Sequence, residues 1–206
     1  MESMRKTIGQ LSPDEIRKLV GDKYSEVAFQ PTSKYKFAVG SQYALDLGYP
    51  AEEVHGLPGN VAESFTGVSS FLTRFDEFAP DSVILELGSG GGLDTALLTK
   101  RLDPAARIVG IDVSMAMLQR AARSLHQLDA SHVHFNQSLA ESLPIPDNSV
   151  DWVVSNGIFN LSPEKEKILL EIHRVLKPKG RVLCSEIVLY RDPSPEERQN
   201  EDDWFK

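Results

Sequence analysis

Short apolar runs alternate with helical patterns from residue 83 onward. Between the runs, apolar residues fall three and four positions apart, as they do on one face of a helix. This alternation predicts an α/β fold with a mostly parallel sheet and helices on both of its faces. Strands are predicted where β-branched and other apolar residues gather between turn residues, at 83–87, 107–111, 132–136, 150–156 and 181–189.

The N-terminal part is predicted to be partly helical and partly irregular. Ser12-Pro13-Asp14-Glu15 forms a capping box with proline at the first helical position, which predicts a helix from Pro13 to about Val27. Residues 30–59 carry scattered prolines, glycines and aromatics, typical of an irregular cover or lid. From Val61 to Phe78 the apolar positions repeat at three and four, which predicts a further helix whose phenylalanines pack in the core.

Two later helices have boundary signals. Ser114 can cap a helix that runs through Leu128. Ser162-Pro163-Glu164 begins another helix, which stops before Pro178 and Gly180. Both helices follow predicted strands, so they continue the alternation toward the C-terminus.

A glycine-rich loop follows the strand at 83–87. Glu86 and Leu87 end that strand, and Gly88-Ser89-Gly90-Gly91-Gly92 lead into a helical pattern. Glycine accepts positive φ and has no Cβ, so a ligand can lie against bare backbone at the helix N-terminus. Twenty residues past Gly92 the next strand ends in Asp112, where a nucleoside-binding unit places a carboxylate for two ribose hydroxyls. The dinucleotide fingerprint needs glycine where this chain has Leu93, which disfavours a nicotinamide-dependent oxidoreductase.

Composition excludes several classes of function. The 206 residues suit one domain, and the net charge of −8 argues against nonspecific binding to nucleic acid or to an anionic membrane surface. Without a long apolar run or a signal peptide, we expect a soluble, cytoplasmic protein. One cysteine excludes an intramolecular disulfide and a cysteine metal cluster. His132 and His134 share a strand face without a third ligand nearby, so no metal is assigned.

Several segments together resemble the class I S-adenosylmethionine-dependent methyltransferases. Glu86 and the glycine loop are similar to their motif I, and Ala140–Asp151 with Leu176–Gly180 resembles the ubiquinone and menaquinone C-methylating enzymes. The likeness to the arsenite methyltransferase family is closer, covers nearly the whole chain and is most restrictive over Ser155–Glu166. It implies a Rossmann-like, doubly wound sheet of about five strands in the order 3-2-1-4-5, with an N-terminal helical cover.

The resemblance implies S-adenosylmethionine as cofactor and a small molecule as methyl acceptor. Gly88, Ser89 and Gly90 would pass under the methionine part, and Asp112 would hold the ribose hydroxyls. Other matched positions would line the adenine, reach its edge, or border the donor sulfur. The full cofactor-binding set is Glu86, Gly88, Ser89, Gly90, Gly92, Asp112, Val113, Met117, Leu139, Ala140, Asn156 and Gly157.

The chain departs from this family in two respects. Many relatives place an acid at the position of Leu139 to accept the adenine amino group, and here only backbone can serve. Arsenic-binding relatives use several cysteine thiolates, whereas this chain has only Cys184, and Gly157 replaces the cysteine of their Ser-Asn-Cys motif. Catalytic residues stay unassigned; Glu186 is the nearest candidate for a general base, and a surface or capping role explains it more simply.

We expect three regions: an N-terminal helical or lid region at 1–79, a cofactor-binding core at 80–190 and an acidic tail at 191–206. The fifth strand would leave an exposed sheet edge, which a homodimer could cover.

The chain ends at Lys206, one residue before a metal-binding cysteine of the arsenite methyltransferases, so termination at a selenocysteine codon is one hypothesis and an engineered shortening another. The expected function is methyl transfer to a small acceptor; the alternative is a truncated, catalytically weak S-adenosylmethionine-binding module that acts through association.

Overall fold

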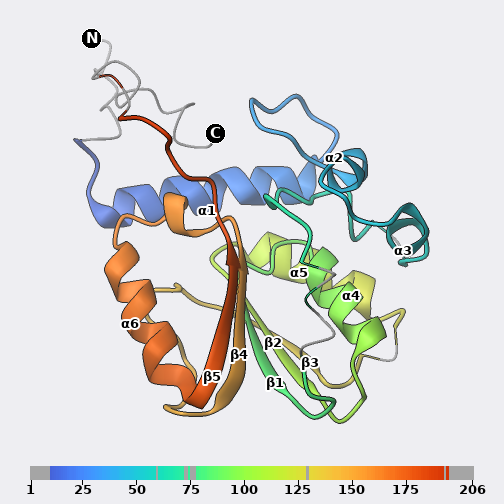
Figure 1. Cartoon of the computed structure of the whole chain (residues 1–206). Coiled ribbons are helices and arrows are strands. Elements are labelled where there is room, and N and C mark those ends of the chain that lie inside the picture. Colours follow the sequence, from blue (N-terminus) through green and yellow to red (C-terminus); the bar gives the residue numbers. More distant parts are fainter. Residues whose placement is uncertain are drawn as a thin grey trace.

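The computed structural model describes residues 10–58, 60–71, 74, 78–128, 130–192 and 194. A parallel sheet lies at its centre, with helices on both sides (Figure 1). The elements in chain order are α1 (Pro13–Phe29), α2 (Ser41–Asp46), α3 (Ala51–His55), β1 (Val83–Leu87), α4 (Leu93–Arg101), β2 (Arg107–Asp112), α5 (Met115–Leu125), β3 (Val133–Gln137), β4 (Val150–Asn156), the 3-10 helix η3 (Phe159–Leu161), α6 (Lys165–Val175) and β5 (Leu176–Ser185).

The sheet has five strands in the order β3-β2-β1-β4-β5, which confirms the predicted fold. Every neighbouring pair is parallel, so all carboxyl ends meet at one edge. At that edge Leu87 of β1 is in register with Ile111 of β2 and with Ser155 of β4. The chain reverses its winding direction after β3, and ligands of such sheets bind beyond the carboxyl ends near this point.

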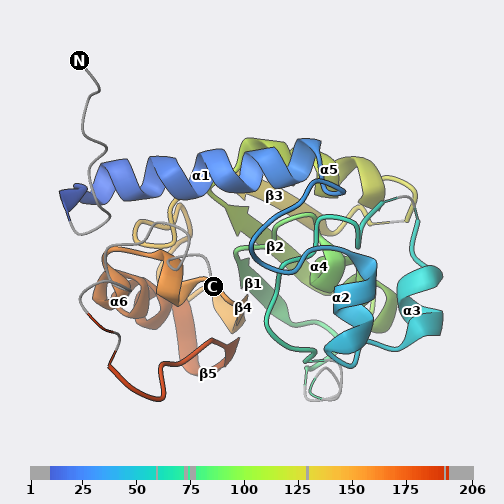
Figure 2. The ribbon, with the colours of Figure 1, turned by 90° about the horizontal axis from the view of Figure 1, so that it is seen from above.

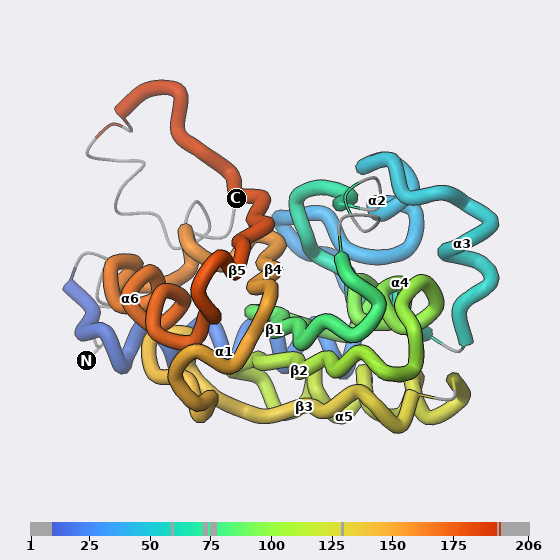
Figure 3. The backbone as a smooth tube through the Cα atoms, turned by 60° about the horizontal axis from the view of Figure 1, so that its bottom comes forward, coloured from blue at the N-terminus to red at the C-terminus, as the bar shows by residue number. Residues whose placement is uncertain are grey.

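Each face of the sheet is buried by its own set of helices. Ile84 and Ile108 pack with Leu97 of α4 on one face, whereas Leu85 and Val153 pack with α6 on the other. Figures 2 and 3 show α6 and α4 on opposite sides of the sheet. Residues 30–58 and 60–71, called here the cover segment, include α2 and α3 and pack against the α4 side.

Helix α1 begins as predicted and runs two residues beyond the expected end. The Ser12 hydroxyl accepts the Glu15 amide at 3.2 Å, and a Glu15 carboxylate oxygen accepts the Ser12 amide at 2.7 Å, which completes the capping box. The helix crosses above the carboxyl ends of the strands (Figures 1 and 2). It therefore lies over the region where a ligand is expected.

The helix predicted from Val61 to Phe78 is wrong for the described residues, since 61–71 form turns and loop. The amides of Val68 and Ser69 donate to the Asn156 side chain at 2.7 and 3.2 Å instead of to helical carbonyls. The expected burial is confirmed for Val61, Phe65, Phe71 and Phe78, whereas Leu72 and Phe75 lie outside the described residues. The apolar spacing of this segment therefore correctly predicted which residues are buried but not that the backbone is irregular.

Other boundaries shift by a few residues. Helix α5 ends at Leu125 instead of Leu128, and α6 begins at Lys165, just after Ser162-Pro163-Glu164. Strand β5 begins at Leu176 and ends at Ser185, so the prediction of a strand from Arg181 to Leu189 is wrong at both ends. Leu176 pairs with Val150 and Arg181 with Trp152, and the register shift between these pairs accommodates Pro178 and Gly180 inside the strand.

Candidate active site

A cavity lies where the carboxyl ends of β1, β2 and β4 meet the loop after β3. Its empty volume is about 790 Å³, part of which is open to solvent. Most of the predicted cofactor-binding residues come together here. Those that line the cavity are Gly88, Gly90, Asp112, Val113, Leu139, Ala140, Asn156 and Gly157.

The loop after β1 requires glycine at the cavity. Gly88 and Gly90 have φ angles of +71° and +51°, in the left-handed region. A Cβ at Gly88 would lie 2.2 Å from Cγ2 of Ile158, whereas one at Gly90 would meet nothing closer than 4.0 Å. The amides of Gly88 and Ser89 donate to the Ile111 carbonyl at 2.7 and 3.0 Å, which holds the loop against β2. The cavity therefore has a bare-backbone floor that suits a close-fitting ligand.

Asp112, at the end of β2, fixes this loop and faces the cavity. Its Oδ2 accepts the Gly90 amide at 2.9 Å, and its Oδ1 accepts the Ser114 amide at 2.7 Å. Burial raises the pKa of Asp112 to about 6, although hydrogen bonds from the amides of Ser114, Gly90 and Val113 act in the opposite direction. The carboxylate retains acceptor capacity for hydroxyl groups of a ligand.

Glu86 lies behind the glycine loop and does not line the large cavity. It is buried and accepts a hydrogen bond from the Thr95 hydroxyl of α4. Burial and the neighbouring Asp94 carboxylate raise the pKa of Glu86. With Ser89 and Asp94 it lines a smaller cavity that shares Gly88 and Gly90 with the large one. The Ser89 hydroxyl is buried there without a hydrogen-bond partner among the described residues.

The Asn156 side chain joins the cover segment to α4. Its Nδ2 donates to Asp94 Oδ2 and to the Ser69 carbonyl, each at 2.9 Å. Tyr49 donates its hydroxyl to Asp94 Oδ1 at 2.6 Å. Burial raises the pKa of Asp94, against the hydrogen bonds from Tyr49 and Asn156. Because its amide makes these internal contacts, Asn156 shapes the cavity wall and keeps the cover segment in place.

Helix α1 forms a roof over the cavity. Arg17, Val20 and Tyr24 project from it into the cavity lining. Burial raises the pKa of the Tyr24 hydroxyl, and the charges of Asp112 and Glu186 add to this effect. The capping box predicted the helix, and the resemblance implied an N-terminal helical cover, but no local signal indicated that Arg17, Val20 and Tyr24 would line the cavity.

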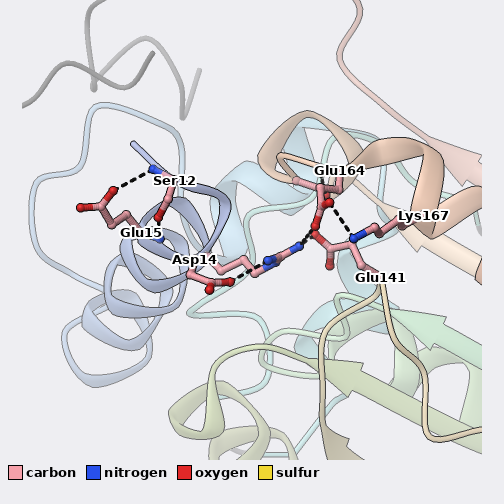
Figure 4. A network of polar contacts seen from close by, with 8 residues as sticks. Ser12, Asp14, Glu15, Glu141, Glu164 and Lys167 are labelled. Atoms are coloured by element: carbon pink, nitrogen blue, oxygen red, sulfur yellow. Dashed lines mark hydrogen bonds and ion pairs between the residues drawn. The ribbon is translucent and has the colours of Figure 1, made fainter. Parts of the chain in front are cut away.

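Arg17 ties this roof to two loops of the core. Its guanidinium donates to Asp14 at 2.8 Å and to Glu141 at 3.4 Å, and it also pairs with Glu164. Burial opposes the charge on Arg17, but the hydrogen bonds with Glu164 and Asp14 outweigh burial and raise the pKa of Arg17. Figure 4 shows Glu141 and Glu164 next to each other, facing the first turns of α1.

Two predicted cofactor-binding residues lie elsewhere. Gly92 is the N-cap of α4 with φ of +88°, and a Cβ there would lie 2.9 Å from Ala121 Cβ, so glycine permits α4 to pack on α5. Met117 is fully buried in a cluster with Val27 and Ala28 of α1. These two residues support the walls of the site and do not line the cavity.

Glu186 has a capping role. Its Oε1 accepts the amides of Ile158 and Phe159 at 2.9 and 3.1 Å, at the start of η3. It does not line the cavity. Glu186 therefore stabilises the turn that carries Gly157 and Ile158, both of which do line it.

The described part of the chain has neither a cluster of metal-binding side chains nor a helix that could cross a membrane. No group of three or more His, Cys, Asp or Glu side chains among the described residues could hold a metal ion. Cys184 is exposed on β5, and partial burial together with Glu186 raises the pKa of its thiol. No helix within the described ranges has the length and apolar character needed to cross a membrane.

Comparison with known sequences identifies relatives of the chain. Residues 79–204 match the family described as Methyltransferase domain. The chain is 30% identical to the arsenite methyltransferase of Halobacterium salinarum over 213 residues, which cover 95% of this chain and 53% of that protein. It is 36% identical to the ubiquinone/menaquinone biosynthesis C-methyltransferase of Escherichia fergusonii over 105 residues, 50% of this chain and 41% of that protein. The chain thus spans about half the length of these relatives.

A solved structure agrees with this assignment. An arsenic(III) S-adenosylmethionine methyltransferase from Chlamydomonas reinhardtii matches with a TM-score of 0.50 and 26% identity, over 70% of this chain and 48% of that one. The family match begins before β1 and includes the glycine loop, Asp112 and all five strands of the sheet. The chain therefore belongs to the methyltransferase domain family.

Proposed function

We propose that the chain binds S-adenosylmethionine in the cavity over the glycine loop and transfers its methyl group to a small-molecule acceptor. The observation that carries this proposal is the hydrogen bond from Gly90 to Asp112, since both residues line the cavity. It places a side-chain-free floor next to a half-buried carboxylate, the two features that a nucleoside with an amino-acid extension requires.

In this proposal the cofactor lies across the strand ends. Gly88, Ser89 and Gly90 support the methionine part, and Asp112 accepts hydrogen bonds from the ribose hydroxyls. Val113, Leu139 and Ala140 surround the adenine, while Asn156 and Gly157 border the sulfur. Residues 80–190 act as the cofactor-binding core, and residues 1–79 act as its helical cover.

When bound, S-adenosylmethionine supplies a sulfonium-activated methyl group, which an acceptor lone pair can attack in line. The chain contributes position and a dry site. Val20 and Tyr24 roof the cavity, and Glu186 holds the turn beside it through Ile158. No base is needed unless the acceptor must lose a proton.

The relatives make trivalent arsenic the first acceptor to test. Trivalent arsenic favours soft thiolate ligands, and the only cysteine of these 206 residues is Cys184. We therefore propose an arsenite methyltransferase-like enzyme whose acceptor receives no set of thiolates from this chain. An arsenic substrate would carry thiols of its own, such as two glutathione ligands.

Calorimetry with S-adenosylmethionine and S-adenosylhomocysteine tests the cofactor site, and we expect both to bind with one site per chain. Binding of neither would reject the proposal. Turnover is then measured as S-adenosylhomocysteine release with trivalent arsenic plus glutathione, and with quinol, amine and thiol acceptors. Release that depends on one acceptor supports methyl transfer, and binding without acceptor-dependent release contradicts it.

We also propose a homodimer paired through β5. This strand is last in the sheet order, and among the described strands it pairs with β4 alone. Val182 on it is 46% exposed, and unpaired strand edges favour association. Sedimentation should show a dimer that V182K weakens. A monomer at all concentrations would contradict this.

A further inference from the structure

We propose that Glu186 is a positioning residue for methyl transfer. Through one carboxylate oxygen it fixes the turn of Gly157 and Ile158, which in the proposed function borders the donor sulfur and its methyl group. The inference rests on the proposed function and gives Glu186 a role that requires no contact with cofactor or acceptor. It follows from how the turn is held and from what its residues touch.

The turn lies between two regular elements and belongs to neither. Strand β4 ends at Asn156 and η3 begins at Phe159, and Gly157 has a φ angle of +85°, in the left-handed region. The Gly157 amide donates to the Ser185 carbonyl at 2.9 Å, at the last pair of β4 with β5. Strand pairing therefore holds the first residue of the turn and stops there.

Glu186, the residue after β5, holds the turn beyond that point. Its Oε1 accepts the Ile158 amide at 2.9 Å and the Phe159 amide at 3.1 Å. Its Oε2 is buried and has no hydrogen-bond partner among the described residues, so the carboxylate binds this part of the chain through Oε1 alone. Bonds from amides to a charged oxygen are stronger than those to a neutral one. One side-chain oxygen thus fixes two consecutive backbone amides.

The turn is also closely packed against the floor and the cover segment. Ile158 fills the space next to Gly88, since a Cβ at Gly88 would lie 2.2 Å from Ile158 Cγ2. A Cβ at Gly157 would lie 3.0 Å from Cγ1 of Val68. A shift of the turn would therefore move Ile158 relative to the glycine loop on which the cofactor is proposed to lie.

Both residues of the turn line the cavity, whereas Glu186 does not. Losing the Glu186 contacts should therefore change the position of the methyl group more than the affinity for the cofactor. A displacement of about 1 Å in a reacting geometry can lower a rate roughly 100-fold. This separation of position from affinity distinguishes the inference from a purely stabilising role.

The test observes the methyl group directly and needs no acceptor. S-adenosylmethionine with an isotopically labelled methyl group is bound to the protein, and heteronuclear NMR records the methyl resonance. Glu186→Ala removes the acceptor oxygen, so this resonance should shift and broaden. Glu186→Gln keeps an oxygen that can accept both amides, so the resonance should stay close to that of the unmodified protein. Calorimetry with S-adenosylhomocysteine should show less than about a threefold change in affinity for either variant.

Glu171→Ala is the matched control. Glu171 also accepts a backbone amide, that of Leu143 at 2.6 Å, but neither residue lines the cavity. E171A should lower the free energy of unfolding in urea and leave the methyl resonance unchanged. The inference is wrong if E186A leaves the resonance unchanged, if E186Q alters it as much as E186A does, or if E171A alters it equally.

Turnover gives a second measurement with any acceptor that supports S-adenosylhomocysteine release. E186A should lower kcat at least about tenfold with the KM for S-adenosylmethionine nearly constant, and E186Q should retain most of the activity. A normal kcat for E186A would also overturn the inference. If the unmodified protein binds neither S-adenosylmethionine nor S-adenosylhomocysteine, the proposed function itself fails.

Discussion

The Gly90 amide donates to Asp112 at 2.9 Å, so the end of β2 holds the loop that follows β1. Asp112→Ala removes this bond, the bond to Ser114 and the proposed acceptor for the ribose. We expect S-adenosylhomocysteine to bind roughly 10- to 100-fold more weakly, the effect of losing a charged hydrogen-bond partner. Calorimetry measures this loss, and circular dichroism checks the fold.

The control for this prediction is Asp103→Ala. Asp103 also accepts a backbone amide, that of Ala105 at 2.8 Å, but lies between α4 and β2 at the amino-end side of the sheet. Its replacement should leave cofactor affinity unchanged. Equal affinities of D112A and D103A would contradict the role given to Asp112.

Gly88→Ala should destabilise the protein by about 1–3 kcal/mol, since it adds backbone strain and a Cβ 2.2 Å from Ile158 Cγ2. Gly48→Ala is a control for strain alone, since Gly48 has φ of +90° and a Cβ there would meet nothing within 4 Å. Ile158→Ala in the G88A background should recover part of the loss. Denaturant unfolding of all variants measures these changes in the free energy of unfolding. If G88A loses no more stability than G48A, the predicted clash with Ile158 is wrong.

The buried Glu86 carboxyl group should make the protein less stable as pH rises. Burial and Asp94 raise its folded-state pKa above the ordinary value of 4.5, so the folded state binds this proton more tightly than the unfolded chain. The favourable contribution is complete below pH 4.5 and is lost as pH rises toward the raised folded pKa. Glu86→Gln should abolish this loss and stabilise the protein most at pH 8.

Urea unfolding at pH 5.5 and pH 8 measures the effect. The exposed Glu52→Gln on α3 is the matched control, because it removes the same charge without changing a buried group. If E86Q and E52Q change stability by the same amount at both pH values, the burial of a charged Glu86 carboxylate has no energetic cost.

The ion pairs of Arg17 should hold α1 over the cavity in a way that high salt weakens. Arg17→Gln removes the pairs with Glu141 and Glu164, and we expect S-adenosylhomocysteine to leave roughly fivefold faster, the scale of a partly exposed ion pair. High salt should accelerate release from the unmodified protein and hardly affect R17Q. Lys18→Gln is the control, because it breaks the exposed Lys18–Asp22 pair of the same helix. Its rate of S-adenosylhomocysteine release, measured by stopped flow, should equal that of the unmodified protein. Equal release rates for R17Q and K18Q would show that the Arg17 pairs do not retain the ligand.

The sequence predicted elements whose signals are local. The capping box at Ser12 and the apolar run before Gly88 gave α1 and β1, because neighbouring residues determine both. The glycine loop and Asp112 were also predictable, since their spacing is fixed by one strand-helix-strand unit. These features account for most of the cavity floor.

The roof and the cover segment depend on distant contacts. Asn156 hydrogen-bonds with Tyr49, 107 residues earlier, and Arg17 pairs with Glu141, 124 residues later. No periodicity encodes such pairs. The apolar spacing of 61–71 predicts a helix wrongly for a related reason: a loop that is hydrogen-bonded to Asn156 can bury its apolar residues at the same intervals as a helix.

The Asn156 contacts also bear on where this protein can be divided. A fragment starting at residue 80 would keep every strand of the sheet but would lose Tyr49, Ser69 and the buried Phe65. The Asp94 carboxylate and the α4 face would then meet water. Such a fragment should expose apolar surface and aggregate, because residues 49–71 supply part of the packing around α4.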